Sequence, residues 1–245
     1  AVDKLYYKSL TPKMAIFKEL VGKTVDELSS EELEIYNDKI VSSVCDCFNS
    51  IGNNKTNGYG LLDENLNGKY DDFHDFIKAR QYETSHTLAE HKELSGLFDL
   101  IYANYKDIIN SDNSLVPIDT NLKNIMVLKN GDIKFCDPGE MISGPILMGY
   151  GDFVAHVYKT QLYDKLIEKL QLDYNQEKLL RIYAIFSSLN ILAFLKRIGI
   201  NDLDKQIPYG NTYTFYQLIS EHLKSLGLAD TCLVNSGKKR IHDKN

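Results

Sequence analysis

The sequence predicts an α+β fold that is mainly α-helical and contains one short β-hairpin. Apolar residues recur at helical spacing over most of the chain. This pattern stops at residues 115–137, where two short runs of strand-forming residues flank Asn130-Gly131, and Asn-Gly is the strongest short hairpin signal. With 245 residues, 43% of them hydrophobic, the chain can bury a core without disulfides.

The individual elements are predicted from local signals. A short apolar run over residues 11–21 ends at Gly22 and predicts a strand followed by a connection. Ser29 and Glu32 form a capping box, which predicts a helix over residues 30–49. The Gly- and Asn-rich residues 50–70 predict an exposed loop with a short hairpin. Further helices are predicted over residues 71–83, 88–110, 151–170, 174–198 and 212–227.

Composition argues against several partners and compartments. The chain carries 28 Lys and Arg against 34 Asp and Glu, a net charge of −6, and its basic residues are scattered, so we expect no nucleic-acid partner. Apolar runs such as residues 189–195 are shorter than the roughly 20 residues that span a bilayer, and no signal-peptide pattern is present, so we expect no membrane contact. The four cysteines form no disulfide framework, and we expect a cytoplasmic protein.

A two-residue turn at Asn130-Gly131 predicts the register of the hairpin. Paired positions then sum to 261, and the series ends with Asn124 opposite Asp137. Directly opposed residues have Cβ atoms about 5 Å apart, so the Asn124 amide and the Asp137 carboxylate could hold one Mg²⁺, which prefers oxygen ligands. Asp119 lies five residues before Asn124, on the approach to the same strand end.

These three side chains match the needs of phosphoryl transfer from a nucleotide. One carboxylate orients and deprotonates the attacking hydroxyl, while an Asn and a second Asp hold the metal on the phosphates. The alternative for each residue alone is structural: Asp119 as a loop cap, Asn124 as a strand-edge residue and Asp137 as part of a turn. Their joint spacing across the hairpin favours the functional interpretation.

The segment from Asp119 to Asp152 resembles the catalytic segment of the aminoglycoside phosphotransferase and choline kinase group, small-molecule kinases with a protein-kinase-like fold. In that group a His-x-Asp-x-x-x-x-Asn loop precedes a hairpin, a metal-binding Asp and a further Asp that opens a helix. The resemblance implies that Asp119 is the catalytic base, that Asn124 and Asp137 bind the metal, and that Asp152 supports the catalytic loop.

The same resemblance implies a nucleotide-binding segment and a reaction. Residues 17–24 resemble the connection between the two kinase lobes, which places Glu19, Leu20 and Val21 at the nucleotide. The implied reaction is Mg²⁺-dependent transfer of the γ-phosphate of ATP or GTP to a hydroxyl of a small-molecule acceptor.

The domain organisation follows from the same likeness. Residues 1–24 are expected to be the end of the small lobe and the interlobe connection. Residues 25–237 are expected to form the carboxyl-terminal, helical kinase-like lobe, and residues 238–245 a polar tail.

Two departures from the family pattern leave two interpretations open. Pro117 stands where the group has His, and no Gly-rich loop precedes Gly22. We expect the chain to be a carboxyl-terminal fragment of such a kinase, with an amino-terminal lobe missing. The alternative is a catalytically inactive kinase-like lobe that binds a ligand or a partner protein.

A third, weaker interpretation is a calcium-binding helical protein. Residues 63–71 match several positions of a calcium loop. Position 12 is His74, however, where the bidentate Glu of such a site belongs, so we expect a polar turn at this place.

Overall fold

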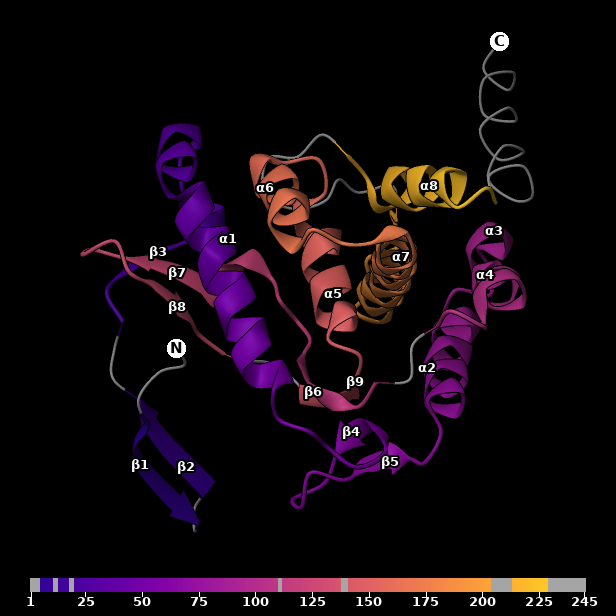
Figure 1. Cartoon of the computed structure of the whole chain (residues 1–245), viewed down its shortest axis with the longest axis horizontal. Helices are drawn as coiled ribbons and strands as arrows, with labels where there is room; N and C mark the ends of the chain where they lie inside the picture. The colour runs from indigo at the N-terminus through magenta and orange to yellow at the C-terminus, as the bar shows by residue number, and fades with distance from the viewer. Residues whose placement is uncertain are drawn as a thin grey trace.

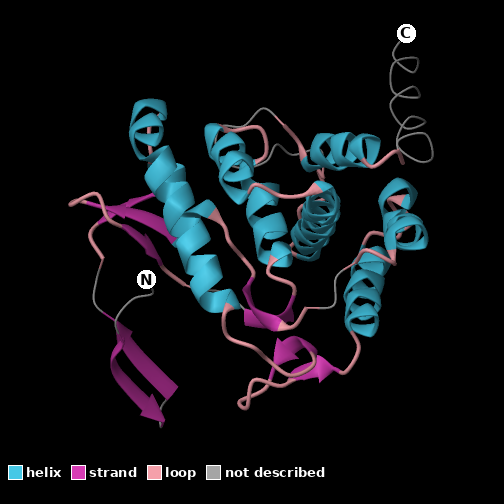
Figure 2. Cartoon of the chain, in the orientation of Figure 1, coloured by secondary structure: helices cyan, strands magenta, loops and turns pink. Residues whose placement is uncertain are grey.

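The computed structural model (Figure 1) describes residues 5–10, 13–17, 20–109, 112–137, 141–203 and 213–228. Its helices are α1 (Ser30–Gly52), α2 (Phe73–Thr87), α3 (Lys92–Ser95), α4 (Leu97–Tyr105), α5 (Leu147–Val157), α6 (Gln161–Leu170), α7 (Tyr174–Arg197) and α8 (Phe215–Ser225), with short 3₁₀ turns at Val25–Glu27 and Leu122–Asn124. Its strands are β1 (Leu5–Leu10), β2 (Lys13–Phe17), β3 (Gly22–Thr24), β4 (Tyr59–Leu62), β5 (Gly68–Tyr70), β6 (Ser114–Pro117), β7 (Ile125–Leu128), β8 (Ile133–Phe135) and β9 (Met141–Gly144). Helices dominate and the strands form small antiparallel sheets (Figure 2), which confirms the predicted α+β, mainly helical fold.

Helix α7 is the core helix of this arrangement, with α5, α2 and α8 packed against it. Gly151 lets α5 come close, because a Cβ atom there would lie 2.5 Å from Tyr183 Cβ and 2.9 Å from the Ala184 nitrogen. By length and composition α7 could cross a membrane, but 67% of its most apolar window is buried inside the fold. Its apolar residues therefore serve the core.

Helix α1 begins where the capping box predicts. Ser29 Oγ accepts a hydrogen bond from the Glu32 N–H at 3.2 Å, and the Ser29 N–H donates to Glu32 Oε2 at 2.8 Å. The helix continues to Gly52, beyond the predicted end at residue 49. It packs against β6 and α6 and buries Phe48, which places this ring beside the segment that carries the predicted site.

The segment that carries the predicted site residues connects strands of two small sheets. The order β3-β7-β8 adds β3 as a third strand to the predicted hairpin, and the order β5-β4-β9-β6 includes the hairpin predicted within residues 50–70. Strand β6 lies at an edge of its sheet, where Pro117 pairs with Met141. A proline is tolerated there because no further strand in the described part of the chain needs its missing N–H.

Two predicted helices are wrong in their extent. Residues 88–110 form α3 and α4 rather than one helix, because Gly96 interrupts the run and serves as the cap between them. Residues 151–170 belong to α5, which begins earlier, and to α6. Lys159 adopts a left-handed φ of +55°, a conformation that ends helices, and Thr160 Oγ1 caps α6 by accepting the Tyr163 N–H at 3.4 Å.

The amino-terminal apolar run also differs from the prediction. Strand β2 covers only part of residues 11–21 and pairs antiparallel with β1, which the sequence did not predict. Gly22 begins β3 rather than ending a strand. The predicted polar tail, residues 238–245, lies outside the described residues.

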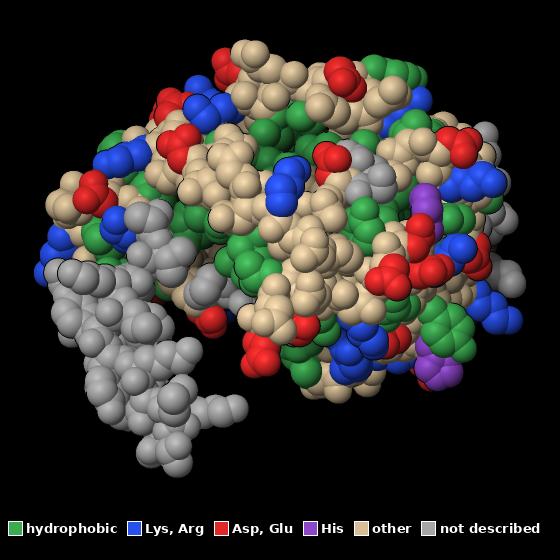
Figure 3. Space-filling model, turned by 60° about the horizontal axis from the view of Figure 1, so that its bottom comes forward, with side chains coloured by type: hydrophobic (Ala, Val, Ile, Leu, Met, Phe, Trp, Pro, Cys, Tyr) green, Lys and Arg blue, Asp and Glu red, His purple; other side chains and the backbone are tan. Residues whose placement is uncertain are grey.

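Charged side chains of both signs mix on the surface. On the face drawn in Figure 3, Lys and Arg side chains intermingle with Asp and Glu. Ion pairs such as Lys159–Glu221 at 2.7 Å and Lys165–Asp38 at 3.1 Å pair opposite charges elsewhere in the fold. This mixing agrees with the scattered charges of the sequence, on which the expectation of no nucleic-acid partner rests.

Candidate active site

The hairpin β7–β8 differs from the prediction by one residue in register. Val127 lies opposite Ile133, so paired positions sum to 260 rather than 261. The connection has three residues because Gly131 adopts φ +77° and donates its N–H to the Leu128 carbonyl at 2.8 Å. A tight turn followed by a left-handed residue is the common three-residue hairpin loop, and it competes with the two-residue turn for the same Asn-Gly signal.

The predicted pairing of Asn124 with Asp137 is therefore wrong. The Asn124 carbonyl accepts the N–H of Cys136 at 2.8 Å. A shift of one residue turns a strand side chain to the opposite face, but Asp137 lies beyond the end of β8 and has a left-handed φ of +45°, so strand alternation does not apply to it. Asn124 and Asp137 consequently still line the same pocket.

That pocket also receives Asp119 and lies between α1, the end of β6 and the hairpin β7–β8. It holds about 380 Å³ of empty space, part of it open to solvent, and Phe48 and Phe135 contribute apolar wall. Asp119 has a left-handed φ of +66°. Such backbone positions are strained for residues other than glycine, and strain of this kind gathers at functional sites; here it occurs at both acidic residues of the pocket.

The amide of Asn124 is oriented by Asp119. Asn124 Nδ2 donates to the Asp119 carbonyl at 3.0 Å and lies 3.4 Å from Asp119 Oδ2. Because the nitrogen half of the amide is used in this way, the oxygen Oδ1 is the half available to a ligand. An amide oxygen and the exposed carboxylate of Asp137 in one pocket form the donor set that suits a hard cation such as Mg²⁺.

The surroundings of Asp119 favour its protonated form. Partial burial raises the pKa of its carboxyl, and the neighbouring carboxylates of Asp152 and Asp137 raise it further. His156 and the hydrogen bond from Asn124 act in the opposite direction. A raised pKa makes the Asp119 carboxylate a stronger proton acceptor than an ordinary aspartate.

Asp152 connects the Asp119 loop to two helices. Its Oδ2 accepts the Thr120 N–H at 2.7 Å and the Thr120 hydroxyl at 2.8 Å, and its Oδ1 accepts the hydroxyl of Ser187 on α7. Since Thr120 follows Asp119 directly, Asp152 on α5 sets the position of the loop. Sequence analysis singled out Asp152 but missed Thr120 and Ser187, which carry no motif.

His156 is a further residue that sequence analysis missed. It lies one helical turn after Asp152 on α5, is 6% exposed, and its Nδ1 has no hydrogen-bond partner among the described residues. Burial lowers the pKa of His156, while the carboxylates of Asp152 and Asp119 raise it. The four-residue spacing from Asp152 was a usable signal, because it places both side chains on one helix face.

The predicted nucleotide-binding segment is described only in part. Glu19 lies outside the described residues; Leu20 is half-buried and Val21 is 53% exposed. The Val21 carbonyl accepts the Lys129 N–H at 3.3 Å, so this backbone oxygen is already engaged by the hairpin loop. The segment therefore lies directly beside the hairpin that carries the pocket.

Calcium binding finds no support in the 63–71 loop. Asp63 Oδ1 accepts the N–H groups of Asn65 and Asn67 at 2.8 and 2.9 Å, which holds the turn between β4 and β5. Among the described residues, no group of three or more His, Cys, Asp and Glu could hold a metal. A magnesium site built from one Asn and one Asp falls below that number, because Mg²⁺ completes its shell with water and phosphate oxygens.

The fold is shared with small-molecule kinases that have a protein-kinase-like fold, as comparison with solved structures shows. This finding confirms the fold-level resemblance predicted from the sequence. No protein-family model matches the chain, and no curated protein sequence matches it significantly.

Three of the similar structures define the group. Aminoglycoside phosphotransferase APH(4)-Ia, solved with AMP-PNP and hygromycin B, has 18% identity and a TM-score of 0.60 over 76% of this chain, and this chain covers 65% of its length. Choline kinase LicA from Streptococcus pneumoniae has 11% identity and a TM-score of 0.60, with 91% and 75% of the two chains covered. A putative fructosamine-3-kinase from Haemophilus somnus 129PT has 14% identity and a TM-score of 0.52, with 92% and 72% covered.

Proposed function

We propose that this chain is the helical lobe of a small-molecule kinase of the aminoglycoside phosphotransferase type. It would transfer the γ-phosphate of ATP or GTP to a hydroxyl of a small acceptor, with Mg²⁺ as cofactor. Residues 25–237 would form the lobe, and the segment before them the end of a small lobe with the interlobe connection. The buried thiols of Cys45 and Cys47 suit the reducing cytoplasm to which the proposal assigns the protein.

One observation carries the proposal: Asp119, Asn124 and Asp137 line a single pocket. Asp119 can accept a proton, and the other two offer oxygen ligands. The structural neighbours include proteins solved with AMP-PNP, ADP or AMP, and with hygromycin B as a second ligand. Their fold supports the reaction class, because phosphoryl transfer depends mainly on positioning and electrostatics rather than on covalent chemistry.

Each residue of the pocket has a distinct part in the proposed reaction. Mg²⁺, when bound to Asn124 Oδ1 and Asp137, would neutralise the charge on the nucleotide phosphates. Asp119 would orient the acceptor hydroxyl and take its proton at the carboxylate, aided by the raised pKa. Asp152 would keep Asp119 in place through Thr120.

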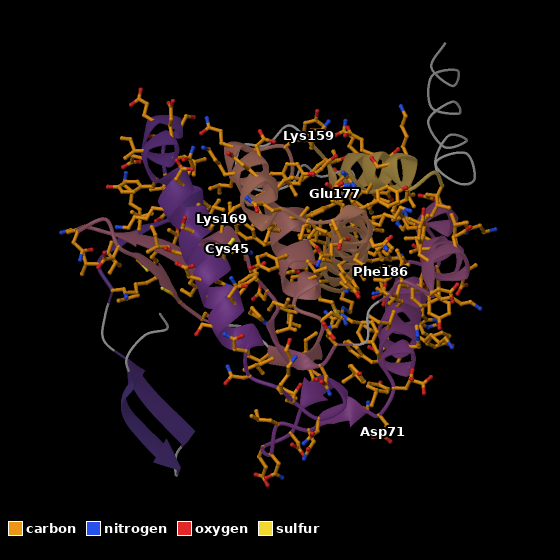
Figure 4. The ribbon with its side chains drawn as sticks, viewed as in Figure 1. Cys45, Asp71, Lys159, Lys169, Glu177 and Phe186 are labelled. Carbon is orange, nitrogen blue, oxygen red and sulfur yellow. The ribbon has the colours of Figure 1, made fainter. Side chains whose placement is uncertain are left out.

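Calorimetric titration with ATP and GTP, with and without Mg²⁺, tests the proposal. We expect Mg²⁺-dependent binding that weakens at least about tenfold in Asp137→Ala, because a charged metal ligand is lost. Asp71→Ala removes an exposed carboxylate between β5 and α2 (Figure 4) that does not line the pocket, and should leave the affinity unchanged. Equal losses of nucleotide affinity in both variants, or an affinity that is the same with and without Mg²⁺, would contradict the proposed metal site.

A second candidate function is a kinase-like lobe that binds ligands without catalysis. Pro117 favours it, because the position that holds His in the resembling family ends an edge strand here and offers no side-chain donor. Phosphoryl transfer measured with a panel of hydroxyl acceptors separates the two functions. Mg²⁺-dependent nucleotide binding without turnover, in a protein that includes any preceding lobe, would favour the binding module.

A further inference from the structure

A second, larger pocket lies between α2 and α7. It holds about 780 Å³ of empty space, part of it open to solvent. Its polar and charged side chains come from these two helices, which pack against each other. They are Arg80, Glu83, Thr84, Thr87, Asn190 and Arg197. Neither the sequence motifs nor the proposed phosphoryl transfer accounts for this set.

The pocket is built for an anion accompanied by hydroxyl groups. Two arginines and one carboxylate, Glu83, line the pocket, so its lining carries more positive than negative charge. Arginine offers planar, paired N–H donors that match carboxylate and phosphate oxygens. A polycationic ligand would meet two like charges here.

Asn190 adds an oriented donor to this lining. The Thr84 hydroxyl has one proton and two acceptors within reach, Asn190 Oδ1 at 2.6 Å and the Arg80 carbonyl at 3.1 Å, and the shorter contact is to Asn190. Thr84 is buried. With its oxygen engaged, the amide of Asn190 offers its N–H₂ group to a ligand. A donor fixed in this way costs little entropy on binding.

The pocket has a smaller neighbour on the side of the proposed catalytic loop. A smaller adjoining pocket shares Arg80 and Asn190 with it and is also lined by Asp152 and Ile118. Ile118 in turn lines the pocket of Asp119. The shared lining residues therefore place the arginine-lined pocket next to Asp152, which holds the proposed catalytic loop.

Gln81 supplies an independent sign of a ligand along this path. Its side chain is 1% exposed and lines the adjoining pocket, yet Gln81 Oε1 has no hydrogen-bond partner among the described residues. A buried acceptor left unpaired destabilises the folded state, so a hydrogen-bond donor at this place is favoured. A hydroxyl group bound beside Phe186, which Figure 4 labels on α7, would satisfy it.

We propose that the pocket between α2 and α7 binds the anionic group of the phosphoryl acceptor, which would be a polyhydroxylated carboxylate or phosphate ester. Arg80 and Arg197 hold the anion, Asn190 donates to it, and Glu83 and Gln81 accept from hydroxyl groups. The assignment of this molecule as the acceptor rests on the proposed kinase function. The selection of an anion by the pocket stands on the lining alone.

Calorimetric binding of four probes without nucleotide tests the pocket: gluconate, glucose 6-phosphate, glucose and hygromycin B. We expect gluconate or glucose 6-phosphate to bind more tightly than neutral glucose or the aminoglycoside. Arg197→Gln should weaken the anionic probe at least about tenfold, as for loss of a charge-assisted hydrogen bond. Arg80→Gln should act in the same direction, with circular dichroism to verify folding.

Lys196→Gln is the matched control, because Lys196 is next to Arg197 but pairs with Glu90 at 2.8 Å and does not line the pocket. Equal losses in Lys196→Gln and Arg197→Gln would overturn the proposal, as would preferred binding of glucose or hygromycin B. Inorganic phosphate that binds as tightly as glucose 6-phosphate would overturn the polyhydroxylated class.

The proposed kinase function and the proposed anion binding can be contradicted by different results. Arg197-dependent anion binding without phosphoryl transfer from Mg²⁺-ATP or Mg²⁺-GTP would support the pocket and contradict the kinase function. Transfer to a neutral or cationic acceptor, with unchanged affinity in Arg197→Gln, would support the kinase function and overturn the pocket.

Discussion

The carboxylate of Asp152 accepts two hydrogen bonds from Thr120, one from its backbone N–H at 2.7 Å and one from its hydroxyl at 2.8 Å. Ser187 on α7 donates to the other carboxylate oxygen. A single side chain on α5 therefore fixes the residue next to Asp119 and links it to the core helix.

Asp152→Asn should lower both stability and turnover. The amide offers one oxygen where three donors now converge, so at least one donor loses its acceptor, at about 1–3 kcal/mol, or roughly 2–10 °C in Tm for a chain of this size. Turnover should fall about a hundredfold because the loop shifts, while the affinity for Mg²⁺-nucleotide stays within about twofold. Thermal denaturation and single-turnover kinetics measure the two effects; Ser187→Ala, which removes one donor, should be milder in both.

Asp119→Asn should separate catalysis from binding. Loss of the proposed proton acceptor predicts a fall in turnover of about 10²–10⁴-fold. Nucleotide affinity should persist, because Asn124 and Asp137 are intact. Near-normal turnover in this variant would remove Asp119 from the role of base, and calorimetry on the same preparation shows whether the site has kept its ligand.

Gly151→Ala should destabilise the fold through the contact of α5 with α7. The new Cβ would lie 2.5 Å from Tyr183 Cβ and 2.8 Å from the Tyr183 carbonyl carbon, and overpacking of this kind costs about 1–3 kcal/mol. Gly96→Ala is the control, since a Cβ there would meet nothing within 4 Å and the residue has φ −90°. Chemical denaturation should show a lower midpoint for Gly151→Ala alone; equal midpoints would refute the close-contact argument.

His222 should make the protein sensitive to acid. It is 1% exposed, and both its ring nitrogens lack hydrogen-bond partners among the described residues; burial and the charges of Arg181 and Lys159 lower its pKa to about 3. Below pH 6.5, the approximate pKa of His in the unfolded chain, the unfolded state binds a proton at His222 and the native state does not. As the pH falls from about 6.5 to the pKa of the folded state, this residue therefore lowers the free energy of unfolding by roughly 1.4 kcal/mol per pH unit.

His222→Phe tests that pH dependence. Phenylalanine keeps a ring against Tyr158, whose centroid is 4.7 Å from the imidazole, and carries no titrating group. The free energy of unfolding, measured from pH 7 to pH 4, should fall less steeply in the variant. His86→Phe, at an exposed position of α2, should keep the steep slope of the unaltered protein.

Local signals predicted the helices well where a cap or a long period marks them. The Ser29–Glu32 capping box identified the start of α1, and the period over residues 174–198 identified α7. The breaks at Gly96 and Lys159 were missed, since apolar spacing continued across both. Periodicity reports which side of a chain is buried and not where its backbone turns.

The candidate site shows a similar limit. Asp119, Asn124 and Asp137 were found by spacing, but their geometry followed from a left-handed Gly131 that shifts the hairpin by one residue and a left-handed Asp137 that redirects the side chain. The partners of Asp152 come from distant positions, Thr120 and Ser187. Tertiary packing brings them together, and no short-range pattern records it.

Strand β3 has a practical consequence for how this chain can be shortened. β7 has β8 on one side and β3 on the other, so a version that begins after Thr24 would expose a row of unpaired backbone groups along β7. Such edges recruit other chains and promote aggregation. Gly22 itself is irreplaceable there, because a Cβ would lie 2.2 Å from the Val127 carbonyl oxygen. A truncated protein that stays monomeric in solution therefore has to begin before Gly22.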